Sequence, residues 1–229
     1  MTLSPGTGAG DGAVPQRAVA SAPGPAAVGV TQLGPDWIPG PDGVPYRRGA
    51  RLILLDEADR VLMVQGHDVD QPERHWWFTP GGGIDPGESG VAAAVRELRE
   101  ETGLALDPSA VEGPVATRSA VFDFHRQAVR QDEEFFVARV TAPGPMVTDG
   151  WTDVERSFMD ELRWWDLDAL EAASEQVFPE AFVPLVRALL TGWDGVVREL
   201  PDETAVLDEA APGTGSTAAS RRPGPPRKA

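Results

Sequence analysis

Three glutamates near the middle of the chain have a spacing that can hold a metal ion. Glu97, Glu100 and Glu101 stand three and four residues apart, so on a helix their carboxylates project from one side. Carboxylates this close repel one another, and the neighbouring Arg96 and Arg99 neutralise only part of the cluster. Their oxygens suit a hard divalent cation such as magnesium. The alternative is a solvated helix face in which Arg96 pairs with Glu100.

The helix that must carry these glutamates has clear ends in the sequence. Ser89 is suited to cap its first turn, and Gly103 lies where a helix C-terminus favours a left-handed residue. Between them Val91, Val95 and Leu98 form an apolar stripe at helical spacing. The pattern predicts a helix that packs on a core with this stripe and presents the carboxylates from another side.

The other elements alternate between apolar strands and helices, which indicates an α/β (α+β) fold with a mixed β-sheet covered on two faces. In chain order they are strands over 51–55 and 61–64 joined by a turn, an aromatic strand over 76–79, strands over 115–124, 128–140 and 162–165, a short helix from Asp168, and an amphipathic helix from about Glu180 to Trp193.

Composition divides the chain into one folded domain and two low-complexity ends. The 229 residues include 25 glycines and 22 prolines, which are concentrated near the two ends. Segments of this kind bury too little apolar surface to offset chain entropy. We therefore predict a disordered Gly/Pro/Ala-rich arm over 1–46, a folded domain over 47–200 and a disordered tail over 201–229.

Charge and the missing cysteine exclude several classes of protein. With 36 acidic and 20 basic side chains the formal net charge is −16, which argues against a nucleic-acid or anionic-membrane partner. The chain has no cysteine, so disulfide scaffolds and thiolate metal sites are excluded and the cytoplasm is the expected compartment. No apolar run is long enough to span a membrane. His67, His75 and His125 show no metal-ligand spacing.

From Gly82 to Leu104 the sequence reads Gly-x5-Glu-x7-Arg-Glu-Leu-x-Glu-Glu-x-Gly-Leu. This pattern resembles, without a departure, the signature box of the Nudix hydrolases. The segment over 77–82 is similar to the strand and turn that precede the box in this family, and the segment over 161–170 is similar to the strand and helix that close the domain. The resemblance spans about residues 47–195 and leaves out both ends.

The resemblance implies a Nudix-type α/β/α sandwich that hydrolyses a pyrophosphate bond in a nucleoside diphosphate linked to another group. The partner would be a small nucleotide-type substrate: a nucleotide, a nucleotide sugar or a damaged nucleoside triphosphate. Carried over onto this sequence, Glu97, Glu100, Glu101 and the backbone carbonyl of Gly82 would bind Mg²⁺, or alternatively Mn²⁺. Such a metal would reverse the local negative charge where phosphate must bind.

The same resemblance gives roles to the residues around these ligands. Arg96 would orient Glu97, and Glu88 would lock the loop to Arg96 or assist in binding the metal. Gly81 and Gly83 would let the backbone approach the substrate phosphates without a Cβ in the way.

The general base is not defined by the box, because family members use either a box glutamate, here Glu97 or Glu100, or a later carboxylate. Asp132, Glu133 and Glu134 precede an apolar strand, and we predict Glu134 as the later carboxylate because it adjoins that strand. The alternative is a solvated acidic turn.

Two adjacent tryptophans are candidates for contact with the substrate. Successive side chains on a strand face opposite ways, so one of Trp76 and Trp77 can line the pocket while the other packs in the core. Trp77 is our predicted substrate-binding residue, and core packing is the alternative for each.

Two functions from different classes remain. The first is a metal-dependent pyrophosphohydrolase, and the second is a catalytically silent, nucleotide-sensing regulatory module. Regulatory members usually have a degraded box, whereas every box carboxylate is present here. A plain calcium-binding or acidic surface protein does not explain the glycine turn at 81–83. The family resemblance also suggests a homodimer.

Overall fold

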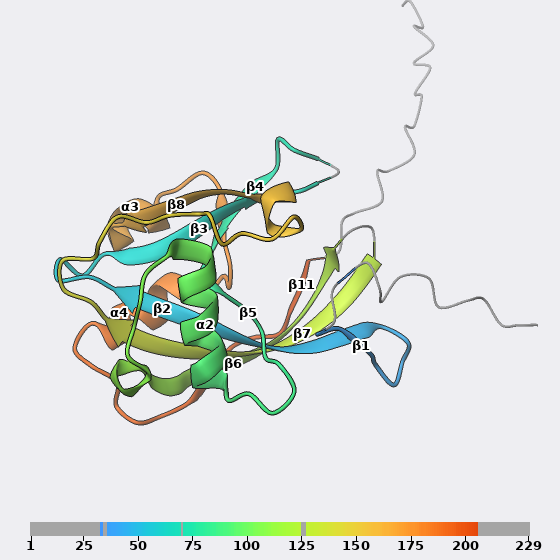
Figure 1. Ribbon diagram of the computed structural model, residues 1–229, viewed down its shortest axis with the longest axis horizontal. Helices are drawn as coiled ribbons and strands as arrows, with labels where there is room; N and C mark the ends of the chain where they lie inside the picture. The colour runs from blue at the N-terminus through green and yellow to red at the C-terminus, as the bar shows by residue number, and fades with distance from the viewer. Residues whose placement is uncertain (1–32, 34–35, 70, 125–126, 206–229) are drawn as a thin grey trace, which may run out of the picture.

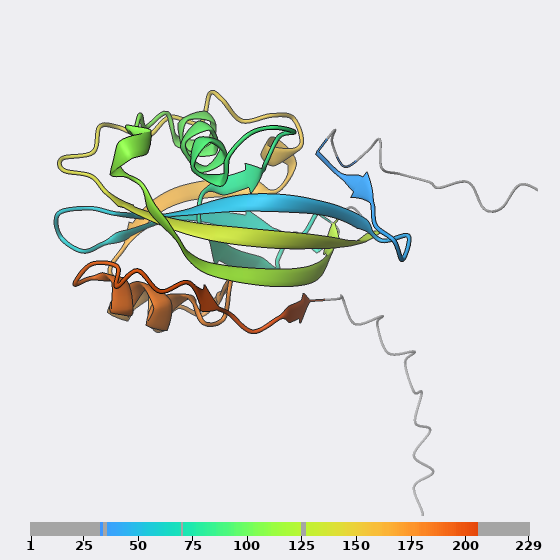
Figure 2. The same ribbon diagram turned by 90° about the horizontal axis from the view of Figure 1, so that it is seen from below.

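The computed structural model describes residue 33 and residues 36–69, 71–124 and 127–205, and most of these form three layers (Figures 1 and 2). A mixed sheet forms the middle layer. Helix α2 (Gly90–Thr102) covers one face, and α3 (Leu167–Glu171) and α4 (Phe182–Leu189) cover the other. This is the α/β/α sandwich with a mixed sheet that the sequence predicts.

The sheet is organised around two long strands that run parallel. β2 (Pro45–Leu55) pairs with β7 (Gln127–Arg139) along its length, and β7 pairs antiparallel with β6 (Glu112–Phe124). β3 (Val61–His67) lies between β4 (His75–Phe78) and β8 (Met159–Trp165) and is antiparallel to both. β2 and β3 share only the Leu55–Val61 pair in register, so the predicted hairpin opens soon after its turn.

Five short strands complete the sheet, and the sequence analysis did not assign any of them as a strand. Each has only two or three residues, which is too short to show a period of two, and each depends on a longer strand or on β4 for its pairing. They are β1 (Ile38–Pro39), β5 (Gly81–Gly83), β9 (Gln176–Val177), β10 (Arg198–Glu199) and β11 (Glu203–Ala205). Two 3₁₀ turns, η1 (Pro108–Ala110) and η2 (Glu155–Ser157), lie between strands.

Helix α2 has the ends that the sequence predicts. The Ser89 side chain accepts a hydrogen bond from the Ala92 N–H at 3.2 Å. At the other end Gly103 has a φ of 72° and its N–H donates to the Arg99 carbonyl at 2.9 Å, which closes the last turn. Its buried face contains Leu98 together with small alanines and, unexpectedly, the carboxyl-bearing residues Glu97 and Glu101.

Alternation along the central strands separates the two cores. Leu52, Leu54 and Phe136 face α2, whereas Ile53 and Phe135 face α3 and α4. Helix α4 is shorter than the predicted helix over 180–193, because the chain turns at Gly192, where φ is 101°.

Segments at both predicted domain boundaries belong to the described structure. Trp37 is 2% exposed and packs with Leu33 and Val129, and β11 pairs in parallel with β6. The predicted limit at residue 47 therefore falls inside β2, and the limit at residue 200 falls between the paired strands β10 and β11. Residues 1–32, 34–35 and 206–229 lie outside the described residues, so their predicted disorder stays a prediction. Within the described part of the chain, no helix is long and apolar enough to cross a membrane.

Candidate functional site

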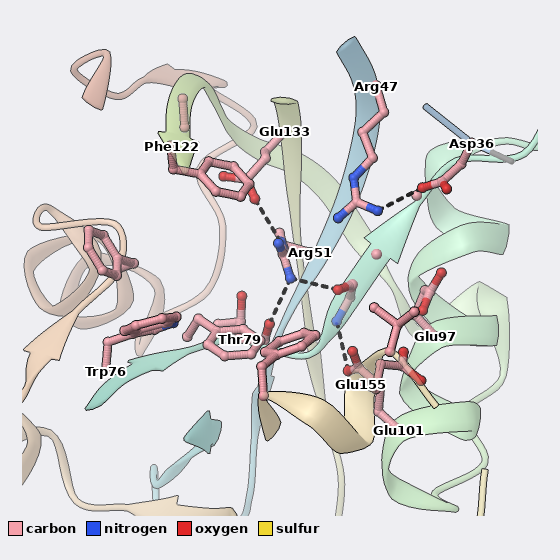
Figure 3. Close-up of a pocket in the computed structure, with 18 of the residues that line it drawn as sticks. Asp36, Arg47, Arg51, Trp76, Thr79, Glu97, Glu101, Phe122, Glu133 and Glu155 are labelled. Carbon is pink, nitrogen blue, oxygen red and sulfur yellow. Dashed lines mark hydrogen bonds and ion pairs between the residues drawn. The ribbon is translucent and has the colours of Figure 1, made fainter. Parts of the chain in front are cut away.

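Two carboxylates of α2 converge with a third from a distant part of the chain. One carboxylate oxygen from each of Glu97, Glu101 and Glu155 lies within 4.8 Å of the others. Glu97 and Glu101 are buried, and Glu155 is half-buried on η2, where it accepts hydrogen bonds from the Thr152 N–H and hydroxyl at 2.6 and 2.8 Å. Figure 3 shows the three side chains together. The arrangement offers a compact set of oxygen ligands.

Glu100 lies apart from this cluster, although the sequence analysis grouped it with Glu97 and Glu101. Its side chain is 52% exposed and accepts a 3.4 Å hydrogen bond from Arg96. The helix explains the separation, because residues four apart differ by about 40° around the axis and residues three apart by about 60° in the other direction. Glu97 and Glu101 thus point to the interior together, while Glu100 lies at the rim of the cavity.

The glycine strand β5 fits against these carboxylates only because it lacks side chains. A Cβ at Gly82 would lie 2.6 Å from the Glu97 carboxylate, and one at Gly83 would lie 2.3 Å from an Asp36 oxygen. Gly81 has a φ of 138°, and its N–H donates to Glu101 at 2.9 Å. The backbone of β5 therefore contacts the carboxylate cluster directly.

Arg96 joins the loop before α2 to the helix. Its guanidinium donates to both oxygens of Glu88 at 3.0 and 2.9 Å, to Glu97 at 2.6 Å and to the Gly83 carbonyl at 2.8 Å. The Asp85 N–H also donates to Glu88 at 3.1 Å. These contacts are the ones expected for an arginine that orients Glu97 and a glutamate that locks the loop.

Burial and mutual repulsion disfavour the ionised forms of the Glu97 and Glu101 carboxylates. Burial raises the pKa of Glu97, although Arg96 opposes the shift. The pKa of Glu101 lies well above its ordinary value because the carboxyl is buried and lies near the charge of Glu97. By contrast, Arg96 lowers the pKa of Glu88. A divalent cation among these oxygens would remove the repulsion.

The cluster forms one end of a cavity of about 530 Å³. Rings line the part of the cavity on the other side of Arg51 from Glu97 and Glu101, and the close-up in Figure 3 shows Trp76 and Phe122 there. The other rings that line the cavity are Trp37, Phe78, Phe135, Phe158 and Phe178.

A network of hydrogen bonds connects the two ends of the cavity, and we call it the floor; it consists of Arg51, Arg118, Gln131 and Glu133. Glu133 is buried and accepts from Arg51 at 2.7 Å, from Gln131 at 2.6 Å and from Arg118 through two nitrogens. Burial alone would raise the pKa of Glu133, but the charges of Arg51 and Arg118 outweigh it and lower that pKa to about 2. Arg51 also donates to the Gly81 carbonyl at 2.6 Å, so the floor reaches β5.

Strand alternation decides which predicted pocket residues reach the cavity. Trp77 is 1% exposed and stacks edge-on against Trp165 in the core, whereas Trp76 lines the cavity. The sequence analysis chose Trp77 for contact with the substrate, whereas the structure buries Trp77 in the core and places Trp76 at the cavity. Likewise, Glu133 faces the cavity, while the Glu134 carboxylate accepts from Arg48 at 2.8 Å and is not among the lining residues. The other Glu134 oxygen lies against the start of α2, where a Cβ at Gly90 would be 2.5 Å from it.

Other residues of the site carried no signal in the sequence. Glu155 lies in an unpredicted 3₁₀ turn, and Arg51 lies within an apolar run that reads only as a strand. Asp36 belongs to the segment predicted as disordered. His67 is different, because its place just before the loop that leads to Trp76 already made it a candidate for the border of the substrate site; it lines the cavity and contacts Asp160 at 2.9 Å. His125 lies outside the described residues. Glu155 has no local sequence pattern, because its partners Glu97 and Glu101 are more than fifty residues away in the chain.

A match to a model of a protein family identifies the family of this chain. The model of the NUDIX domain matches residues 45–186, which is most of the chain, so this protein belongs to the Nudix family. The match contains the box, the floor and Glu155, but it ends before β10 and begins after Trp37.

Relatives with assigned names fall into more than one group. The chain is 35% identical over 105 residues to the "Putative 8-oxo-dGTP diphosphatase" of Bacillus subtilis, an alignment that covers 46% of this chain and 60% of the relative. It is 32% identical over 138 residues to the RNA pyrophosphohydrolase of Rhodospirillum rubrum, which covers 57% of this chain and 78% of that protein. The chain therefore spans less than two thirds of the Bacillus relative.

Solved structures with a similar arrangement include the MutT protein of Bacillus halodurans, with 23% identity and a TM-score of 0.44 over 64% of this chain and 84% of that one. An Ap4A hydrolase of C. elegans has 17% identity and a TM-score of 0.44 over 63% of this chain and 98% of that one.

Proposed function

We propose that this protein is a divalent-metal-dependent hydrolase that cleaves a pyrophosphate bond in a nucleotide-type substrate. The observation that carries the proposal is the convergence of Glu97 and Glu101, both from the Nudix box, with Glu155 against the side-chain-free strand β5. Membership of the family and the relatives named as a diphosphatase and a pyrophosphohydrolase support the same chemistry.

The ligand set fits a hard cation. Three carboxylates lie together in a largely buried place where the pKa of Glu97 and of Glu101 is raised, and oxygen ligands are those that Mg²⁺ and Mn²⁺ prefer. Glu97, Glu101, Glu155 and the Gly82 carbonyl would hold the ion, with Glu100 as a further ligand at the rim. When bound, the ion would stabilise negative charge on the phosphate oxygens and help to activate a water.

The residues of the chain itself position the substrate and move the proton. Arg96 holds the Glu97 carboxylate through a 2.6 Å hydrogen bond, and Glu88 holds Arg96. Glu100 lines the cavity with an exposed carboxylate, so we propose that it accepts the proton of the attacking water. Since Glu134 pairs with Arg48 outside the cavity lining, the base is to be sought among the carboxylates of the cluster and its rim.

The substrate would lie along the cavity with its diphosphate over the carboxylate cluster. The aromatic end offers ring surfaces for a nucleobase. A small nucleotide is favoured over a long nucleic acid because the chain has a net charge of −16. The RNA pyrophosphohydrolase relatives make the 5′ end of an RNA the second candidate. The cytoplasmic location and the homodimer remain predictions.

The test is release of phosphate or pyrophosphate from a panel of nucleoside triphosphates, nucleotide sugars and a short 5′-triphosphorylated RNA. Each compound is assayed with Mg²⁺, with Mn²⁺ and with a chelator. We expect metal-dependent turnover of at least one mononucleotide and a loss of about a hundredfold or more in Glu97→Gln, because that change removes an anionic ligand.

The matched control is Glu171→Gln, which changes an exposed glutamate on the opposite face of the sheet. It should leave turnover within about twofold of wild type. Turnover that survives the chelator, or equal turnover by Glu97→Gln, would contradict the proposal. Tight nucleotide binding without any turnover would instead support the silent regulatory module.

A further inference from the structure

The C-terminal segment over 198–205 contributes one residue, Glu203, to the cavity lining, although it lies beyond the family match that ends at residue 186. β10 and β11 both pair in parallel with β6, and β11 aligns Glu203 with Ala120. Ala120, Val121, Phe122 and Glu203 all line the cavity. In Figure 1, β11 runs beside the end of β6. The first side chain of β11, Glu203, therefore lines the cavity from a strand that lies outside the family match.

Glu203 is fixed in place from two directions. Its Oε2 accepts from Arg118 at 2.6 Å, and its Oε1 accepts from the Glu180 N–H at 2.8 Å. The side chain is 14% exposed. Arg118 in turn donates to Glu133, so Glu203 is tied to the same floor that reaches β5 through Arg51. A side chain held in this way presents a defined hydrogen-bonding edge.

When hydrogen bonds among the described residues are counted, the two carboxylates that bind Arg118 differ, and Glu203 is the one with acceptor capacity left. A carboxylate has about four lone-pair sites. Glu133 accepts four hydrogen bonds: one from Arg51, one from Gln131 and two from Arg118. Glu203 accepts two hydrogen bonds, which leaves about two sites for a ligand.

The charges around Glu203 favour an uncharged group over an anionic one. Arg51 and Arg118 are balanced by Glu133 and Glu203, so no surplus positive charge is present among these four residues to attract a phosphate. An anionic group would meet two carboxylates. An uncharged ring that carries N–H donors would meet both an acceptor and the aromatic surface of Phe122 and Phe178.

We propose that Glu203 is a specificity-determining residue that accepts hydrogen bonds from the donor edge of a guanine-type base. Guanine carries two adjacent donor groups on its pairing edge, a ring N–H and an amino group, whereas adenine pairs one donor with an acceptor that a carboxylate repels. Groups that recognise a polar edge discriminate far more strongly than ring contact alone. This inference rests on the proposed function, since it places the diphosphate at the carboxylate cluster.

The test compares guanosine and adenosine triphosphates, with Mg²⁺, in wild type, Glu203→Gln and Glu199→Gln. Wild type should prefer guanine by at least about tenfold in kcat/KM, and Glu203→Gln should reduce that preference about tenfold, mainly through KM. Glu199→Gln is the matched control, because Glu199 is exposed on β10 in the same segment and does not line the cavity. It should keep the preference within about twofold.

One further measurement separates failure of this assignment from failure of the proposed function. The proposed function fails only if wild type hydrolyses no compound of the full panel. If guanosine and adenosine triphosphates are not hydrolysed, the same preference is measured as a ratio of Kd values for non-hydrolysable guanine and adenine triphosphate analogues. The wild-type ratio does not depend on whether Glu203→Gln folds. No preference for guanine in wild type, or an unchanged preference in a folded Glu203→Gln, would overturn the assignment of Glu203.

Discussion

At the scale of single residues, the cavity floor depends on one buried carboxylate held by two arginines. Replacing Glu133 by Gln leaves Arg51 and Arg118 without their shared anionic partner, and breaking a buried pair from one side costs about 3–5 kcal/mol. The pKa of Glu133 falls from an ordinary 4.5 to about 2 in the fold. Its contribution to stability is thus fully present above about pH 4.5 and is lost as the pH falls toward 2.

The lowered pKa of Glu133 predicts how acid changes the stability of the fold. We expect the difference in free energy of unfolding between wild type and Glu133→Gln to be constant near neutral pH and to shrink between pH 4.5 and 2. Urea unfolding of both proteins at pH 7, 4 and 3 measures it. An exposed change such as Glu199→Gln should show a small difference with no such trend. A Glu133→Gln difference that is equal at pH 7 and pH 3 would contradict the role of the arginines.

At the scale of elements, helix α2 positions the box, and its first turn depends on a local cap. Ser89→Ala removes the acceptor of the Ala92 N–H, so we expect a loss of about 1 kcal/mol in the free energy of unfolding. Turnover at saturating substrate and metal should stay within about twofold, since Arg96 and Glu88 hold the loop independently. Urea unfolding and steady-state kinetics check both statements. Ser174→Ala, outside the helices, is the control, and an equal loss there would contradict the capping role.

The elements also show what can be predicted from sequence. The ends of α2 were predictable because Ser89 and Gly103 act within one turn of the helix. The strands over 115–124 and 128–140 were predictable from their length and composition. β5 and β11 were not, because a segment of three residues becomes a strand only when β2 or β6 is beside it.

The residues of the site also divide into those with a local sequence pattern and those without one. Glu97 and Glu101 carry their signal in a local spacing, and their roles in the metal site still await the experiments above. Glu155 and Glu203 have no local pattern, since each matters only through partners brought to it by folding. The choice between Trp76 and Trp77 depends on which face of β4 is turned to the core, and alternation alone does not define that face.

At the scale of the whole molecule, the charge distribution disfavours a long nucleic acid as the ligand of the proposed site. The net charge is −16, and the arginines that line the cavity have carboxylate partners. The pairs are Arg47 with Asp36, Arg51 with Glu133, Arg74 with Asp68, Arg96 with Glu88, and Arg118 with Glu133 and Glu203. Neutralising many phosphates of a long nucleic acid needs a broad basic surface, which this composition disfavours.

We therefore expect no binding of a labelled 20-nucleotide RNA or duplex DNA below about 10 µM at 0.15 M salt, measured by fluorescence anisotropy. A mononucleotide brings its phosphates to one metal-filled cluster, so its kcat/KM should change less than about threefold between 50 and 200 mM salt. Micromolar RNA binding with a steep salt dependence would contradict this view and favour a substrate with a 5′-triphosphate at the end of a long chain. The comparison of a mononucleotide with a 5′-triphosphorylated RNA is the relevant one, because some relatives are named RNA pyrophosphohydrolases. Both substrates contain the same 5′-terminal pyrophosphate bonds, and the RNA differs by the backbone phosphates of its further nucleotides.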